Sequence, residues 1–73
     1  MHNTVQSIDN NVKTLEKRDL TPAGQNVVNA IKVLVEPYQI KQSKGLAMTL
    51  EDERVLNALL IIVVYMVKDS SIT

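Results

Sequence analysis

Few side chains in this sequence could take part in chemistry. The chain has 73 residues, no cysteine and a single histidine, His2. Nucleophilic catalysis of the serine–histidine–acid kind needs a base that a third group holds against the nucleophile, and a zinc site needs several spaced ligands. Because His2 stands alone beside the start of the chain, the sequence indicates neither arrangement. We expect no catalytic residue, no metal, no cofactor and a protein that is not an enzyme.

Three consecutive carboxylates, Glu51, Asp52 and Glu53, are the densest group of titratable side chains. Such a group could bind a cation or serve as a general acid and base. The group also follows Thr49, whose hydroxyl can cap a helix, and negative charge is favourable in the first turn of a helix. We therefore interpret these carboxylates as solvated charges at a helix start.

The composition is that of a small aliphatic chain with balanced charge. Eight Lys or Arg offset eight Asp or Glu, and the two tyrosines are the only aromatic residues. Nucleic-acid binders usually present a basic surface or stacking aromatic side chains, so we do not expect a nucleic-acid partner. One domain of this size has a marginal core, which oligomerisation could supplement.

The apolar run over residues 55–67 could be mistaken for a membrane span. Its 13 residues would extend about 20 Å as a helix, whereas the hydrocarbon core is about 30 Å thick. We therefore do not expect transmembrane insertion. The first residues are polar and lack the basic and apolar regions of a secretory signal, so the expected location is cytoplasmic.

The N-terminal region carries one apolar seam, in which residues recur at intervals of three, four and three: Val5, Ile8, Val12 and Leu15. This spacing predicts a short amphipathic helix within residues 1–19, although so short a polar helix is marginal in water and could be a partly disordered arm. The seam is exposed unless something covers it. We therefore choose these four residues as the candidate surface for a protein partner, whose identity the sequence does not give.

A second helix is expected to start at Thr21 and Pro22, because a threonine can cap a helix and a proline suits its first position. One face then contains Val27, Val28, Ile31, Leu34, Val35 and Tyr38. Pro37 removes a backbone donor and could end the helix, but Tyr38 keeps the apolar phase. We expect a kink at Pro37, an end near residue 43 and a left-handed stop at Gly45.

A third helix over residues 49–68 is marked by Thr49 and by Asp52 three residues later, the spacing of a capping box. One apolar face contains Leu56, Leu59, Leu60, Val63 and Met66 or Val67. A second face contains Val55, Ala58, Ile62 and Tyr65, with Ile61 and Val64 between the two. A helix that is apolar on all sides must be buried on all sides. Two other helices cannot achieve this in one small chain, so part of the surface should pack against a second copy or another protein.

The run 59–67 could also be a buried strand, since it is rich in Ile and Val. A strand needs neighbours, however, and the other β-like run, 31–35, lies inside a helical pattern. We therefore predict an all-α fold: a helical hairpin core over residues 20–69, a short N-terminal helix or arm over 1–19 and a polar tail over 70–73.

The hairpin is expected to pack as a homodimer or a higher helical bundle. Asn57 could fix the register of such an assembly by pairing across its axis, or could simply face solvent. The residues that we predict for self-association lie on the third helix: Leu56, Leu59, Leu60, Val63, Val67 and Asn57.

The function that these features favour is that of a small non-enzymatic regulatory or adaptor protein, which acts through helix-mediated contacts with proteins and through self-association. One alternative is a helix-turn-helix-like DNA-binding regulator with its turn over residues 43–47. Its reading helix would present either the acidic start of the third helix or Gln25, Asn26, Asn29 and Lys32. A second alternative is a small membrane-associated protein whose face over Ile61 to Val64 enters lipid.

Overall fold

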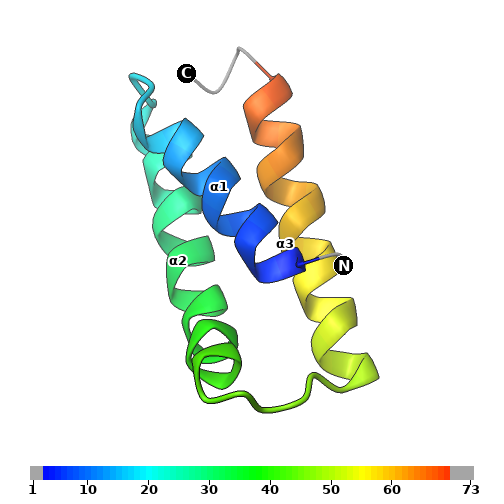
Figure 1. The fold of residues 1–73 in the computed structure, drawn as a ribbon. Helices are drawn as coiled ribbons and strands as arrows, with labels where there is room; N and C mark the ends of the chain where they lie inside the picture. Colours follow the sequence, from blue (N-terminus) through cyan, green and yellow to red (C-terminus); the bar gives the residue numbers. More distant parts are fainter. Residues whose placement is uncertain (1–2, 70–73) are drawn as a thin grey trace.

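The computed structural model describes residues 3–69 and shows an all-α fold. Its helices are α1 (Thr4–Glu16), α2 (Pro22–Ser43) and α3 (Leu50–Lys68). The bundle measures 36 × 18 × 17 Å, and α2 runs antiparallel to both other helices (Figure 1). Residues 3–69 contain no strand, so the all-α prediction is confirmed and the strand alternative for residues 59–67 is wrong. The predicted tail over 70–73 lies outside the described residues.

The capping residues of α2 and α3 are those that the sequence predicts. The Thr21 hydroxyl accepts a hydrogen bond from the Gly24 backbone, and Pro22 occupies the first position of α2. At α3 the Thr49 hydroxyl accepts from the Asp52 backbone, while the Asp52 carboxylate accepts from the Thr49 backbone. This reciprocal capping box satisfies two donors that a helix start leaves without partners. Both helix starts are therefore determined by local sequence.

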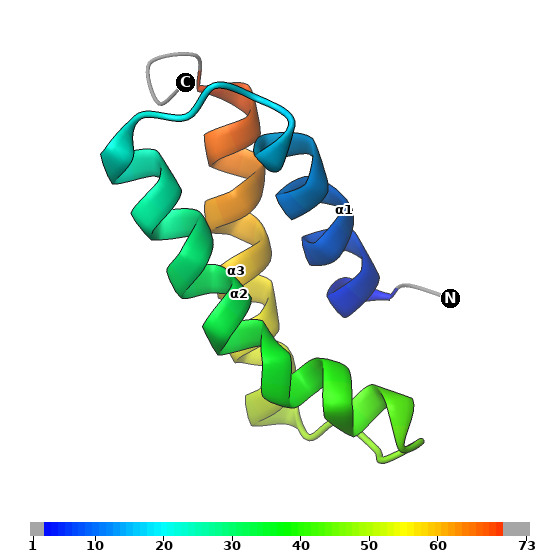
Figure 2. The ribbon, with the colours of Figure 1, turned by 90° about the vertical axis from the view of Figure 1, so that its left-hand side faces the viewer.

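Pro37 lies inside α2 and does not end it. The helix continues for six residues to Ser43, and Figure 2 shows its lower, green part bending away from the line of the upper part. A proline removes one helical hydrogen bond and crowds the preceding turn, which bends a helix when tertiary packing holds both parts in place. Tyr38 provides such packing, because it is half-buried against the core. Gly45 then adopts a φ of 71°, the left-handed conformation that glycine tolerates best.

The core lies between α1 on one side and the pair formed by α2 and α3 on the other (Figures 1 and 2). The helix α1 packs mainly against α3. Every apolar residue of the α1 seam is buried, as are residues of both longer helices. The core consists of Val5, Ile8, Val12, Leu15, Val28, Ile31, Val35, Leu56, Leu59, Val63 and Met66.

Polar contacts connect the helices around this core. The Arg18 guanidinium donates to the Val67 carbonyl oxygen at 2.7 Å and so joins the α1–α2 loop to the last turn of α3. Positive charge is favourable at that end of a helix, where carbonyl groups lack helical partners. The Lys41 ammonium pairs with the Asp52 carboxylate and joins the end of α2 to the start of α3.

Candidate interaction surface

The seam that we chose for a protein partner is covered within the chain. Val5, Ile8, Val12 and Leu15 are all buried, chiefly against α3. As an exposed partner surface this choice is corrected by the structure, because α3 supplies the cover that the seam needs. The N-terminal helix therefore closes the core, and the search for a binding surface moves to the longer helices.

The residues predicted for self-association divide into three groups in the structure. Leu56, Leu59 and Val63 are buried in the core, and Leu60 and Val67 are half-buried against it. Asn57 is exposed, which matches the simpler of the two roles that we considered for it. The sequence analysis underestimated α1, which has only 13 residues but buries four aliphatic side chains on α3. The five apolar residues of this set are therefore wholly or partly buried in the core of the single chain.

The second apolar face of α3 is the one left open. Val55, Ala58, Ile62 and Tyr65 follow one another at intervals of three, four and three residues, and all are exposed. Ile62 is 43% exposed and Tyr65 is 66% exposed. Exposed apolar residues are ordinary when scattered singly, but a contiguous row of them marks an interaction site.

The helix α2 carries a matching row. Val27, Ala30, Leu34 and Pro37 have the same intervals of three, four and three residues and are also exposed. The spacing predicts one apolar face that contains Val27 and Leu34 together with Val28 and Val35, but in the structure this face is divided, since Leu34 is 55% exposed. The signal was present in the sequence, because Ala30 and Pro37 complete a second seam with 3.5-residue spacing.

The two rows lie on the same side of the molecule, away from α1. On α2, Lys32 donates to Glu16 of α1 and Gln39 donates to Asp9 of α1. Leu34 follows Lys32 by two residues, a rotation of about 200° that directs it away from α1.

On α3, Leu60 and Val67 mark the side near α1, since both are half-buried against the core and Arg18 bonds to the Val67 carbonyl oxygen. Ile62 follows Leu60 by the same two-residue step, so it also faces away from α1. Figure 2 shows α1 on one side of the α2–α3 pair and no described segment on the other side. We call the surface formed by the two rows of four residues the open face.

Charged side chains occur only at the ends and edges of the open face. Glu51 continues the α3 row by one further four-residue step, and Lys41 continues the α2 row in the same way. Arg54 lies at the edge of the α3 row and is exposed. The centre of the open face is thus apolar, with mixed charges at its end, which is the usual arrangement of a protein-binding surface.

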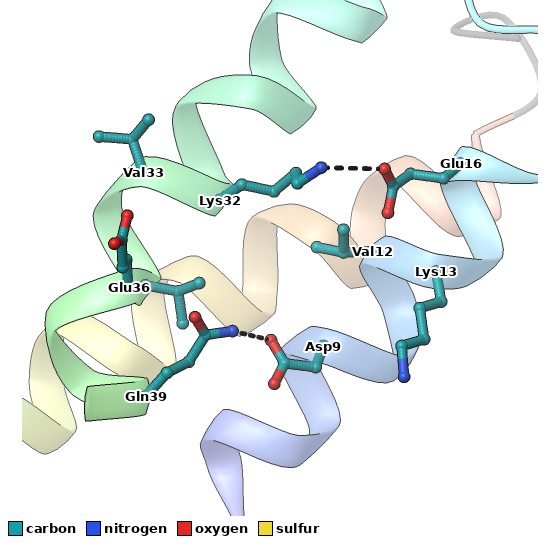
Figure 3. A pocket seen from close by; sticks show the side chains of 9 residues that line it. Asp9, Val12, Lys13, Glu16, Lys32, Val33, Glu36 and Gln39 are labelled. Atoms are coloured by element: carbon teal, nitrogen blue, oxygen red, sulfur yellow. Dashed lines mark hydrogen bonds and ion pairs between the residues drawn. The ribbon is translucent and has the colours of Figure 1, made fainter. Parts of the chain in front are cut away.

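A groove of about 500 Å³ lies between α1 and α2, on the side of α2 away from the open face (Figure 3). Its charged side chains include Lys32 and Glu16, which form an ion pair at 3.1 Å while remaining 51% and 40% exposed. The Gln39 amide donates to the Asp9 carboxylate across the same groove at 2.7 Å. Pairs this exposed add little to stability, and the groove contains no nucleophile held by a base. We interpret these contacts as surface links between α1 and α2.

The acidic start of α3 has a structural role at Asp52. The hydrogen bond from Lys41 lowers the pKa of Asp52 below its ordinary value, and the backbone of Thr49 contributes in the same direction. Across residues 3–69, no three His, Cys, Asp or Glu side chains come together in a way that could hold a metal ion. His2 lies outside the described residues.

The residues considered for DNA reading are largely engaged within the chain. Lys32 pairs with Glu16, Lys41 pairs with Asp52, and the Gln25 amide donates to Asn29. The helices α2 and α3 run antiparallel side by side (Figure 1), whereas the helices of a helix-turn-helix cross at about 90–120°. The structure thus lacks both the basic surface and the crossing angle of that motif in its described part.

None of the helices within residues 3–69 has the length and apolar character needed to cross a membrane. Comparison with known proteins gives no further lead: no family model, no curated protein and no solved structure matches this chain. The open face is therefore the feature from which a function can be argued.

Proposed function

We propose that this protein is a small, non-enzymatic regulatory or adaptor protein that acts by presenting the open face to a protein surface. The observation that carries the proposal is the pair of apolar rows, four residues on α2 and four on α3, which are exposed on one side of the bundle. Leaving so many apolar side chains in water costs free energy that burial against a partner would recover.

The spacing of the rows favours a helical partner surface. Intervals of three, four and three residues are those by which side chains of one helix interlock with the side chains of another. The small residues Ala30 and Ala58 alternate with larger ones along each row, which leaves recesses for the side chains of an opposing helix. A helix packed into an apolar groove is a common mode of protein recognition.

A lipid surface is the alternative occupant of the open face. Amphipathic helices that lie on membranes are usually rich in Lys and Arg along their polar edge. Around the open face the charges are mixed instead, since Lys41 and Arg54 occur together with Glu51 and Asp69. This mixture favours a protein partner over an anionic membrane.

The proposal is tested by placing a photo-crosslinking amino acid at Ile62 and irradiating living cells that express the chain. We expect adducts whose added mass is protein, whether a second copy or another chain. The adducts should be lost when Leu34→Glu is added, because Leu34 lies on the other helix of the open face. Val33→Glu is the matched control, since Val33 is an exposed aliphatic residue that lines the groove beside α1.

Adducts with lipid, or protein adducts that Leu34→Glu does not reduce, would overturn the proposal. Sedimentation with anionic vesicles and a duplex titration at two salt concentrations address the membrane and DNA alternatives separately. We expect neither vesicle nor duplex to bind. Binding to DNA that weakens steeply with salt and is lost on replacing Lys32, Lys41 and Lys44 would instead support the DNA-binding alternative.

A further inference from the structure

We propose that a second copy of this chain occupies the open face, with a two-fold axis parallel to the helices, so that α2 of each copy packs against α3 of the other. This inference rests on the proposed function and specifies its partner. The dimer would be an antiparallel four-helix bundle built from the two long helices of each copy, with α1 on the outside of each copy.

The contact between Lys41 and Asp52 determines which residues of α2 and α3 lie at the same height along the bundle. Lys41 pairs with Asp52 at the lower end of the hairpin, and both helices rise about 1.5 Å per residue in opposite directions. Counting from that contact brings Leu34 within one residue, about 1.5 Å, of the height of Ala58, and brings Ala30 equally close to the height of Ile62. The rows on the two helices therefore match step for step.

Rotation about a two-fold axis parallel to the helices leaves the height of each residue along the bundle unchanged. It places the α2 row of one copy opposite the α3 row of the other. Leu34 of one copy then faces Ala58 of the other, and Ile62 faces Ala30. At these two central levels a large side chain meets an alanine, and each pair occurs twice because of the symmetry. Interdigitation of large and small residues is what fills the space between packed helices.

Charge distinguishes this axis from the other symmetric choice. The other choice is a two-fold axis that lies in the plane of the open face and perpendicular to the helices. It would pack α2 against α2 and α3 against α3 of the second copy, with Ala30 facing Leu34. It would also set Glu51 of one copy against Asp69 of the other, a like-charge pair. The parallel axis instead places Glu51 within one residue of the height of Lys41 of the second copy, and opposite charges at an interface fix register and favour the correct partner.

The size of the open face suits a dimer of this chain. Two helices about 30 Å long whose axes lie about 10 Å apart present a footprint on the order of 600 Å². A standard interface buries roughly 800 Å² of accessible surface on each partner. About 600 Å² on each partner, or about 1,200 Å² in total, lies at the lower end of the range of stable interfaces.

The test uses single-cysteine variants, since the chain has no cysteine of its own. Leu34→Cys and Ala58→Cys are purified separately, checked by circular dichroism and light scattering, mixed and oxidised. We expect the mixture to give on the order of tenfold more covalent dimer than either variant alone, because a disulfide needs the two cysteines opposite each other.

The competing geometries give other products. Efficient coupling in a mixture of Ala30→Cys with Leu34→Cys, but not in the first mixture, would overturn the parallel axis. A native mass of one chain at every concentration would overturn the second copy as the occupant. Photo-crosslinks from position 62 to a different protein would then still support the proposed function, so the two proposals can fail separately.

Discussion

The two apolar faces of α3 both consist of residues at intervals of three and four, but they have different surroundings. One face, which includes Leu56 and Val63, is buried by α1 and α2, whereas the other, which includes Ile62 and Tyr65, remains open. Both faces are apolar enough to be buried in a helical bundle. The difference arises because α1 is a single short helix and can cover only one side of the α2–α3 pair. Substitutions can distinguish the buried face from the open face, and those with the largest expected effect on stability come first.

Shortening a side chain should have a large effect on the buried face and a small one on the open face. Leu56 is 1% exposed, so Leu56→Ala should lower the free energy of unfolding by about 2–5 kcal/mol, as a core cavity does. Ile62→Ala should lower the stability of the single chain by less than about 1 kcal/mol. Urea denaturation at low protein concentration measures both. Equal losses would mean that Ile62 is also covered within the chain.

Removing the guanidinium of Arg18 should weaken the contact between the α1–α2 loop and the last turn of α3. Arg18→Ala deletes the donor to the Val67 carbonyl oxygen, and hydrogen bonds from charged donors contribute about 1.5–3 kcal/mol before allowance for solvent exposure. Because Arg18 is half-buried, we expect a loss of about 1 kcal/mol in urea denaturation. The control Lys17→Ala, at a neighbouring exposed position, should leave stability unchanged. An equal loss for both variants would contradict the role of this contact.

The contact between Lys41 and Asp52 holds α2 beside α3 and so keeps the two rows of the open face together. The pKa of Asp52 is lowered from 3.8, first by the hydrogen bond from Lys41. A lowered folded-state pKa means that the stabilisation is present above the unfolded value and is lost as the pH falls through the folded value. Asp52→Asn should therefore make stability less dependent on pH below about 4.

The measurement is urea denaturation at neutral pH and at acid pH for three proteins. The control is Glu53→Gln, which removes a carboxylate from the same helix turn and should retain the wild-type acid dependence. Should Asp52→Asn lose stability toward acid as steeply as the unchanged chain, the ion pair would not be the cause.

The sequence predicts the helices because their signals are local. Thr21 with Pro22, and Thr49 with Asp52, satisfy backbone donors within a few residues of themselves, so no tertiary information is needed to place those helix starts. The continuation through Pro37 could be inferred from the apolar phase at Tyr38. Each of these features depends on spacing along one helix, which a sequence displays directly.

The choice of face on each helix is not local, and this is where the sequence analysis was wrong. Val27 and Leu34 are aliphatic, as are Val28 and Val35, and only the positions of the other helices decide which of them are covered. The burial of Leu15 and Ile8 against α3 likewise depends on how α1 crosses the hairpin. Two equivalent apolar seams on a helix show that two surfaces exist, but not which of them the chain itself fills.

The most direct test of the account is the native mass of three proteins: the unchanged chain, Leu34→Glu and Val33→Glu. Light scattering on a sizing column over about a hundredfold range of concentration, with circular dichroism on the same fractions, gives mass and helicity together. We expect the unchanged chain and Val33→Glu to approach twice the 8.2 kDa of one chain, and Leu34→Glu to remain at one chain with the same helicity. A single-chain mass for the unchanged protein throughout, or a dimer that Leu34→Glu does not weaken, would contradict the account.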